Sequence, residues 1–221
     1  MSKDLSAFQP LDGFEGVFTA QKGTLRCSAL WLRSGGLCLY SPVLGLGDAA
    51  QASLRDLGEV THLLAPNHYH HKGLGEYHAA FPTAQLCSTG AAAPRLAKQT
   101  GLSFTPLEEA SLPLPDAARF VEPEGLKTGE VWLQIEAADQ RLWIVTDAFR
   151  GAKGPVGAAV ERPELLGTFP SFGIADRRVY RDWLAGMVAE APPSAILPCH
   201  GAMIAGANLA ADAMALIDDL G

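Results

Sequence analysis

The chain has 221 residues, of which 48% are hydrophobic and 19% are charged, and its formal net charge is −7. This composition excludes a disordered chain, and the absence of a basic cluster argues against nucleic acid as a partner. No segment approaches the run of about 20 apolar residues that a membrane span needs. The length suits one domain, which we predict over residues 1–221.

The N-terminal segment and the cysteines both indicate a reducing compartment. The segment MSKDLSAFQPLDGF lacks the apolar run of a signal peptide. Four cysteines are scattered without a C-x-x-C pair, which argues against a disulfide framework and a cysteine-built zinc site. We therefore expect a cytoplasmic protein with reduced thiols.

The first half of the chain predicts strands that give way to alternating helices and strands. A strand at 15–20 precedes a hairpin at 24–42, where apolar residues alternate at period two and Ser34-Gly35-Gly36 supplies the turn. Asp48 is the expected N-cap of the next helix. The expected helices are 48–58, 72–81 and 91–101, and the expected strands are 59–66 and 84–88.

The second half predicts three successive strands, followed by a helix, a fourth strand and a final helix. Residues 102–118 read as a connection because they carry three prolines, and residues 150–167 read as a loop because they are rich in glycine and proline. The expected strands are 118–125, 129–138, 141–149 and 194–198, and the expected helices are 175–191 and 205–221. In the helix at 175–191, Val179, Trp183, Met187 and Val188 are predicted to form the buried face. All four tryptophans are predicted to lie in the core: Trp31, Trp132, Trp143 and Trp183.

This order of elements predicts two sheets covered by helices. A single doubly wound sheet is the structural alternative. No G-x-G-x-x-G motif follows the first strand, so a dinucleotide site has no support.

Potential metal ligands follow three of the predicted strands. The segment APNHYHHKGLGEY places His68, His70 and His71 within four positions after a buried strand, and Asp147 and His200 each follow a later one. Neutral imidazole and carboxylate are the usual protein ligands of zinc and of some iron sites. An ordinary solvated loop is the alternative for the histidine segment.

The segments LLAPNHYHHKGL, WIVTDAF and LPCHGAMI, in this order, resemble the three metal-site segments of the metallo-β-lactamase superfamily. The resemblance extends over nearly the whole chain. It implies an α/β fold of the four-layer αβ/βα sandwich type, with two mixed β-sheets flanked by helices. The stretch PNHYHH is similar to a divergent branch, domains of unknown function that carry Pro-Asn-x-x-His-His.

The chain departs from the superfamily pattern at its first metal position. Where the family has His-x-His-x-Asp-His, Pro66 takes the first His place, His68 the second, His70 the Asp place and His71 the last. Leu126 stands where the family has a further ligand histidine. Neither the proline nor the leucine side chain can bind a metal, so His68 alone survives of the three usual ligands of this position.

The second metal position keeps a full set of ligands. The resemblance implies one divalent ion, with zinc expected and iron or manganese as alternatives, held by His70, His71, Asp147 and His200. Asp147 and His68 are the expected catalytic residues. His68 can act as a ligand, as a neighbour of the ligands or as a proton shuttle, and a solvated side chain is the alternative.

The function that the resemblance implies is metal-assisted hydrolysis. Metal-activated water attacks an ester, amide, lactone or phosphoester. β-Lactams are not favoured, because the motif for two metals is broken. The alternative is a non-catalytic member that binds a metal or small ligand, and a mononuclear iron oxygenase ranks last. We expect a small-molecule substrate as the partner, and a homodimer stays open.

Several further residues have two readings. Glu130 can orient a ligand imidazole or be a surface charge at a strand start. Asn67 is expected to shape a turn, and His62 to pack within its strand. Three aromatic residues after Asp147 can line a substrate pocket, or the segment that holds them is an ordinary covering loop: Phe149, Phe169 and Phe172.

Overall fold

The computed structural model describes residues 3–153 and 158–220, so part of the predicted loop at 150–167 lies outside the described residues. By its internal contacts, the chain divides into two compact units, Met1–Asp116 and Ala117–Gly221. That both units form one domain stays a prediction.

In the described part of the first unit, seven strands form one mixed sheet in chain order. The pairs from β1 to β4 are antiparallel, and those from β4 to β7 are parallel. The strands are β1 (Gln9–Leu11), β2 (Phe14–Lys22), β3 (Leu25–Trp31), β4 (Leu37–Tyr40), β5 (Val60–Leu64), β6 (Gln85–Ser88) and β7 (Thr105–Pro106). The early hairpin and the two later strands were predicted correctly, and β7 is a short addition within the predicted connection.

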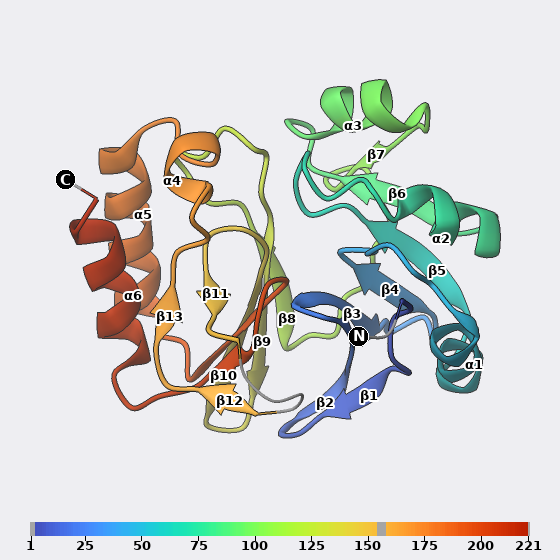
Figure 1. Cartoon of the computed structure of the whole chain (residues 1–221), viewed down its shortest axis with the longest axis horizontal. Coiled ribbons are helices and arrows are strands. Elements are labelled where there is room, and N and C mark those ends of the chain that lie inside the picture. Colours follow the sequence, from blue (N-terminus) through green and yellow to red (C-terminus); the bar gives the residue numbers. More distant parts are fainter. Residues whose placement is uncertain (1–2, 154–157, 221) are drawn as a thin grey trace. The chain divides into compact units, whose positions relative to one another are not determined.

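The helices of the first unit are the crossovers that parallel strands need. They are α1 (Asp48–Leu57), α2 (Leu74–Ala80) and α3 (Ala93–Thr100), and Figure 1 shows them with the sheet they cover. Leu54, Tyr77 and Leu96, one from each helix, share a core with Leu39 and Leu63 of the sheet. All three helices therefore cover the same face of this sheet.

The second unit has a sheet of six strands and a two-stranded sheet within its described residues. The large sheet has the order β12-β15-β14-β10-β9-β8, and β11 pairs with β13. The strands are β8 (Ala118–Val121), β9 (Trp132–Ala137), β10 (Gln140–Val145), β11 (Arg150–Gly151), β12 (Ala159–Val160), β13 (Pro163–Glu164), β14 (Ala195–Pro198) and β15 (Met203–Ile204). Four of these match the predicted strands, whereas the predicted loop contains the short strands β11, β12 and β13.

The helices of the second unit are α4 (Phe169–Phe172), α5 (Arg177–Glu190) and α6 (Leu209–Asp218). Figure 1 shows α5 and α6 side by side against the large sheet. Tyr180 and Leu184 are the buried residues of α5, and they share a core with Trp143 of the sheet. Three members of the predicted face pack against this core, and only Val179, which is 39% exposed, departs from the prediction.

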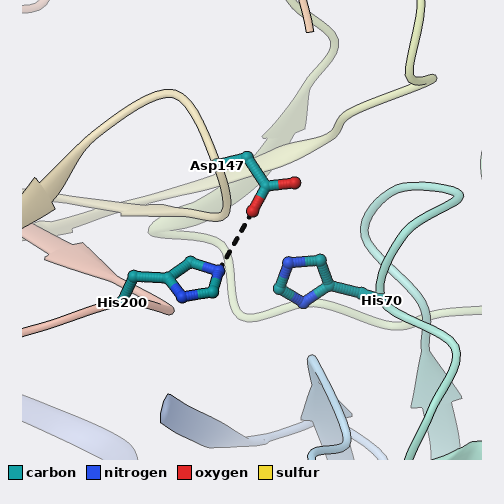
Figure 2. A group of neighbouring side chains, drawn as sticks. All are labelled: His70, Asp147 and His200. Carbon is teal, nitrogen blue, oxygen red and sulfur yellow. Dashed lines mark hydrogen bonds and ion pairs between the residues drawn. The ribbon is translucent and has the colours of Figure 1, made fainter. Parts of the chain in front are cut away.

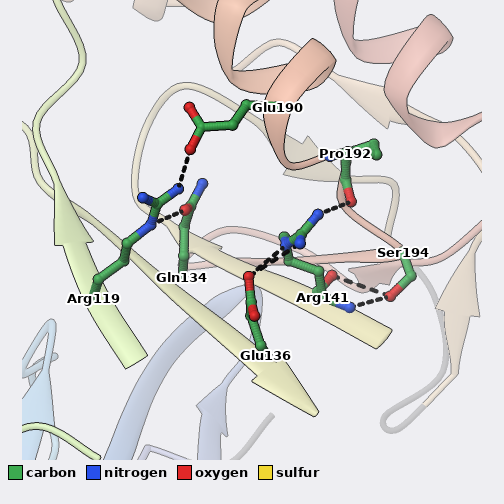
Figure 3. A network of polar contacts seen from close by, with 7 residues as sticks. All are labelled: Arg119, Gln134, Glu136, Arg141, Glu190, Pro192 and Ser194. Atoms are coloured by element: carbon green, nitrogen blue, oxygen red, sulfur yellow. Dashed lines mark hydrogen bonds and ion pairs between the residues drawn. The ribbon is translucent and has the colours of Figure 1, made fainter. Parts of the chain in front are cut away.

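A polar network joins the end of α5 to the sheet (Figure 3). The Arg141 guanidinium donates to Glu136 Oε1 over 3.0 and 3.2 Å and to the Pro192 carbonyl over 3.4 Å. The backbone of Arg141 exchanges two hydrogen bonds with the Ser194 hydroxyl. These contacts fix the connection between α5 and β14, and hence where β14 begins.

Two local predictions are corrected. Helix α1 is preceded by Gly47 as its N-cap without a side-chain hydrogen bond, so Asp48 is the first helical residue rather than the cap. Trp31 is 40% exposed instead of buried, although its indole nitrogen donates to the Leu57 carbonyl. Trp132 lies in the core as predicted.

Candidate metal centre

The histidine segment of the first unit is a turn built on Asn67. Strand β5 ends at Leu64, and Asn67 follows fully buried. Its side-chain oxygen accepts from the backbone N–H groups of Tyr69 at 2.8 Å and of His70 at 3.2 Å. The predicted role of Asn67 in shaping the turn is confirmed.

The same segment is packed against the chain that follows β4. A Cβ at Gly73 would lie 2.5 Å from the Pro42 carbonyl oxygen, so only glycine permits this approach. The Ser41 hydroxyl lies 2.7 Å from Nδ1 of His70. Backbone and side chain of the segment are thus both anchored within the first unit.

His68 and His71 have distinct surroundings. His68 is buried, and its ring meets the ring of Tyr69 edge to face at 4.4 Å between centroids. Its alternative as a solvated side chain is therefore wrong. His71 has a buried Nδ1 for which the described residues supply no hydrogen bond. Such an atom is usually satisfied by water or by a metal ion.

In the second unit, Asp147 and His200 form a pair. Strands β10 and β14 are parallel, and their pairing ends with Val145 opposite Pro198. Asp147 and His200 are each the second residue after that end. Parallel neighbours bring the residues after their C-terminal ends together. The imidazole Nε2 lies 3.1 Å from the carboxylate Oδ1. Figure 2 marks this contact with a dashed line, and the third side chain drawn there, His70, belongs to the first unit.

The loops that carry this pair interlock through their glycines. The N–H of Gly151 donates to the His200 carbonyl over 3.1 Å. A Cβ on Gly151 would overlap the Ala202 carbonyl oxygen, and a Cβ on Gly201 would overlap the Gly151 carbonyl oxygen. Gly201 also has φ +85°, a conformation that favours glycine. The segments after β10 and β14 are therefore held in direct backbone contact.

Leu126 and Glu130 are both enclosed within the second unit. The Leu126 side chain packs against that core, and its backbone bridges to Ile174. Glu130 is 2% exposed, and its Oε1 accepts from the Trp132 indole at 2.8 Å and from the Thr146 N–H at 3.3 Å. The surface-charge reading of Glu130 is thus wrong.

Of the two readings of the aromatic residues after Asp147, the covering loop holds for two of them. Phe149 and Phe169 are fully buried members of the core formed with α5 and α6, so they face that core and not a substrate. Phe172 is 56% exposed. Phe149 and Phe169 therefore belong to a segment that covers the core, as in the covering-loop reading of the sequence.

Sequence reasoning missed two sets of residues that hold the ligand loops. Ser41 gave no signal, because a single serine after a strand is common. Gly151 and Gly201 could have been suspected, since a glycine beside each ligand segment often marks close backbone approach.

No family model and no curated protein sequence matches the chain. Solved structures do match over its whole length. TMB-1 aligns with a TM-score of 0.65 at 12% identity, covering 99% of both chains. The metallo-β-lactamase FIM-1 from Pseudomonas aeruginosa, in its mono-zinc form, aligns with a TM-score of 0.65 at 14% identity, covering 99% of this chain and 97% of its own. A metallo-β-lactamase from Pontibacter korlensis gives a TM-score of 0.56 at 12% identity, with the same coverage.

The chain therefore has the fold of the metallo-β-lactamase superfamily, an α/β sandwich with two mixed sheets and helices. At these identities the likeness establishes the fold alone. In the described part of the chain, no helix has the length and apolar character to cross a membrane.

Proposed function

We propose that the chain is a metal-dependent hydrolase that holds one divalent ion, zinc in the first instance, and acts on a small molecule in the cytoplasm. His70, Asp147 and His200 each offer one ligand atom. His71 lies outside this group of three; it is the proposed fourth ligand because of the resemblance, and because its buried Nδ1 has no hydrogen bond from the described residues. This set places three imidazoles and one carboxylate on the ion, a combination that zinc accepts.

The observation that carries the proposal is the spacing of the Asp147–His200 pair. Two donors that each lie about 2.0–2.1 Å from a tetrahedral ion are roughly 3.3 Å apart. Nε2 and Oδ1 lie 3.1 Å apart, and both residues follow parallel neighbouring strands. The pair thus fits as two adjacent ligands without a change in backbone.

The chemistry follows from the donor set. When bound, a divalent ion acidifies water and polarises a carbonyl or phosphoryl oxygen. The Asp147 carboxylate, beyond binding through one oxygen, can accept a hydrogen bond from the attacking water and orient it. His68 is the proposed proton-transfer group, because imidazole is the commonest general acid or base and His68 lies two positions before His70. The substrate classes are esters, amides, lactones and phosphoesters.

The test combines metal content with turnover. Zinc, iron and manganese are measured in protein purified without chelator, and hydrolysis is assayed on the four substrate classes and on a β-lactam. We expect about one equivalent of metal in the native protein, and turnover that Asp147→Asn and His200→Ala both abolish. Each variant should bind metal more than about 100-fold more weakly, because losing a metal ligand weakens binding more than losing a residue that hydrogen-bonds to a ligand. No β-lactam turnover is expected. His78→Ala, a partly buried histidine on α2, is the matched control and should behave as native.

One observation favours a second candidate, a non-catalytic binding member of the fold. Leu126 stands in the place of a family ligand and packs into the helix-covered core, so its segment cannot supply that ligand. Tight metal binding without turnover on any substrate would establish this candidate. Native protein devoid of all three metals would remove both proposals.

A further inference from the structure

Ser41 is a buried residue in a backbone conformation that serine rarely adopts. It follows β4, its side chain is inaccessible, and its φ is 59°. Left-handed conformations are uncommon in residues other than glycine, asparagine and aspartate. Ala138, in the turn between β9 and β10, is the one other such residue in the described ranges 3–153 and 158–220. A residue held in this conformation in the interior points to a constraint from its surroundings.

The constraint has two parts, and both lie in the first unit. The Ser41 N–H donates to the Leu64 carbonyl over 3.0 Å, which continues the pairing of β4 with β5 by one residue. The Ser41 hydroxyl then lies 2.7 Å from Nδ1 of His70. The left-handed turn at Ser41 is therefore what allows one residue to close the strand pair and reach the imidazole.

The backbone of His70 is fixed separately. Its N–H meets the side-chain and main-chain oxygens of Asn67, each at 3.2 Å. With the backbone held by Asn67, the remaining freedom of His70 is rotation of its side chain. The Ser41 contact removes that freedom and engages one of the two ring nitrogens.

We infer that Ser41 is the positioning residue of His70, and that it reserves Nε2 of this imidazole as the metal-binding atom. The inference rests on the proposed function, in which His70 is a ligand. With an ion on Nε2, Nδ1 carries the proton and donates it to the Ser41 hydroxyl oxygen. Ligand histidines commonly donate their other N–H in this manner, which fixes the tautomer and the ring orientation.

The substitutions Ser41→Gly and Ser41→Ala test the inference. Both remove the hydroxyl, but glycine accepts φ 59° freely, whereas alanine does not. A loss that both variants share comes from the hydroxyl, and a loss limited to Ser41→Ala comes from the backbone. Ala138→Gly is the matched control, because it relaxes a positive φ of 52° away from the histidines.

The readouts are the zinc dissociation constant, from competition with a chelator, the melting temperature of the metal-free protein, and the ¹⁵N shifts of the His70 ring. We expect Ser41→Gly to bind zinc about 10- to 100-fold more weakly, the range for loss of a group that supports a ligand. Its metal-free melting temperature should stay near that of Ala138→Gly. In zinc-loaded native protein, the shifts should show Nδ1 protonated and Nε2 bound.

The possible results distinguish a failure of the role of Ser41 from a failure of the proposed function. Equal zinc affinity in native protein and Ser41→Gly, or zinc bound through Nδ1, overturns the role of Ser41 while the proposed function stands. Native protein that binds no divalent metal overturns the proposed function and, with it, the positioning role. A lower melting temperature of metal-free Ser41→Gly with unchanged zinc affinity identifies a purely structural serine and also overturns the inference.

Discussion

The ligand segments of the two units are held by different means. In the first unit, side chains anchor the histidine segment: the Asn67 amide oxygen holds its backbone, and the Ser41 hydroxyl holds an imidazole. In the second unit, the loops of Asp147 and His200 are locked by backbone contact at Gly151 and Gly201. Removing a side-chain anchor costs its hydrogen bonds but adds no atom, whereas the backbone contact leaves no room for an added atom.

This difference has a consequence for the chemistry of each unit. The Asp147–His200 pair follows from strand register and glycine packing, so its spacing is built into the sheet. The orientation of His70 depends on one hydroxyl and is adjustable by substitution. We therefore expect loss of the Ser41 hydroxyl to change mainly the metal affinity, and an added atom at Gly151 to change mainly the stability.

The largest effect is expected from Gly151→Ala. Its Cβ would overlap the Ala202 carbonyl oxygen, and two backbone segments cannot both yield without losing the hydrogen bond from Gly151 to His200. Overpacking of this kind costs roughly 3 kcal/mol of unfolding free energy. Urea denaturation of metal-free protein measures it.

Gly167→Ala is the control for this change. Gly167 lies in the same part of the chain, and a Cβ there would meet nothing within 4 Å. We expect its unfolding free energy to change by less than about 0.5 kcal/mol. Similar values for the two variants would show that the glycine interlock does not hold the loops.

The second prediction concerns the anchor of the histidine segment. Asn67→Ala removes an acceptor that serves two backbone N–H groups in a fully buried position. The Tyr69 N–H would lose its acceptor and the His70 N–H would keep only the Asn67 carbonyl, so the unfolding free energy should fall by about 2 kcal/mol. Asn208→Ala is the control, because Asn208 is an exposed helix cap that makes no side-chain cap hydrogen bond. An Asn67→Ala loss no larger than that of Asn208→Ala would contradict the anchoring role.

The sequence predicts this fold well because its signals are local and repeated. Alternating residues such as Cys27 and Ala29 mark the early hairpin, and Asp176 marks the start of α5 by accepting from the Val179 N–H. The loop after Asp147 was harder to read, because two-residue strands such as β11 leave no periodic pattern.

The candidate ligands were visible in the sequence, but their supports were not. Asp147 and His200 stand after apolar runs, and parallel pairing of those runs explains why they meet. Ser41 lies 29 positions before His70, and nothing in either segment announces their hydrogen bond. The sequence left two readings for Phe149, because a loop aromatic that covers a sheet has the same sequence pattern as one that lines a pocket, and the structure shows it buried.

The smallest effect is a pH dependence located in the first unit. His62 lies buried in β5, the strand that leads into the histidine segment, and burial lowers its pKa below the ordinary value of 6.5. The unfolded chain therefore binds a proton more readily than the folded one. Stability from this residue is present above pH 6.5 and is lost as the pH falls through that value toward the lowered folded pKa. In metal-free protein we expect His62→Gln to narrow the difference in unfolding free energy between pH 7.5 and 5.5, because glutamine carries no titrating proton. An equal decrease of this pH-dependent difference in His78→Ala, or no decrease in His62→Gln, would assign the pH dependence to other groups. The pH dependence would then not be located at His62 in the first unit.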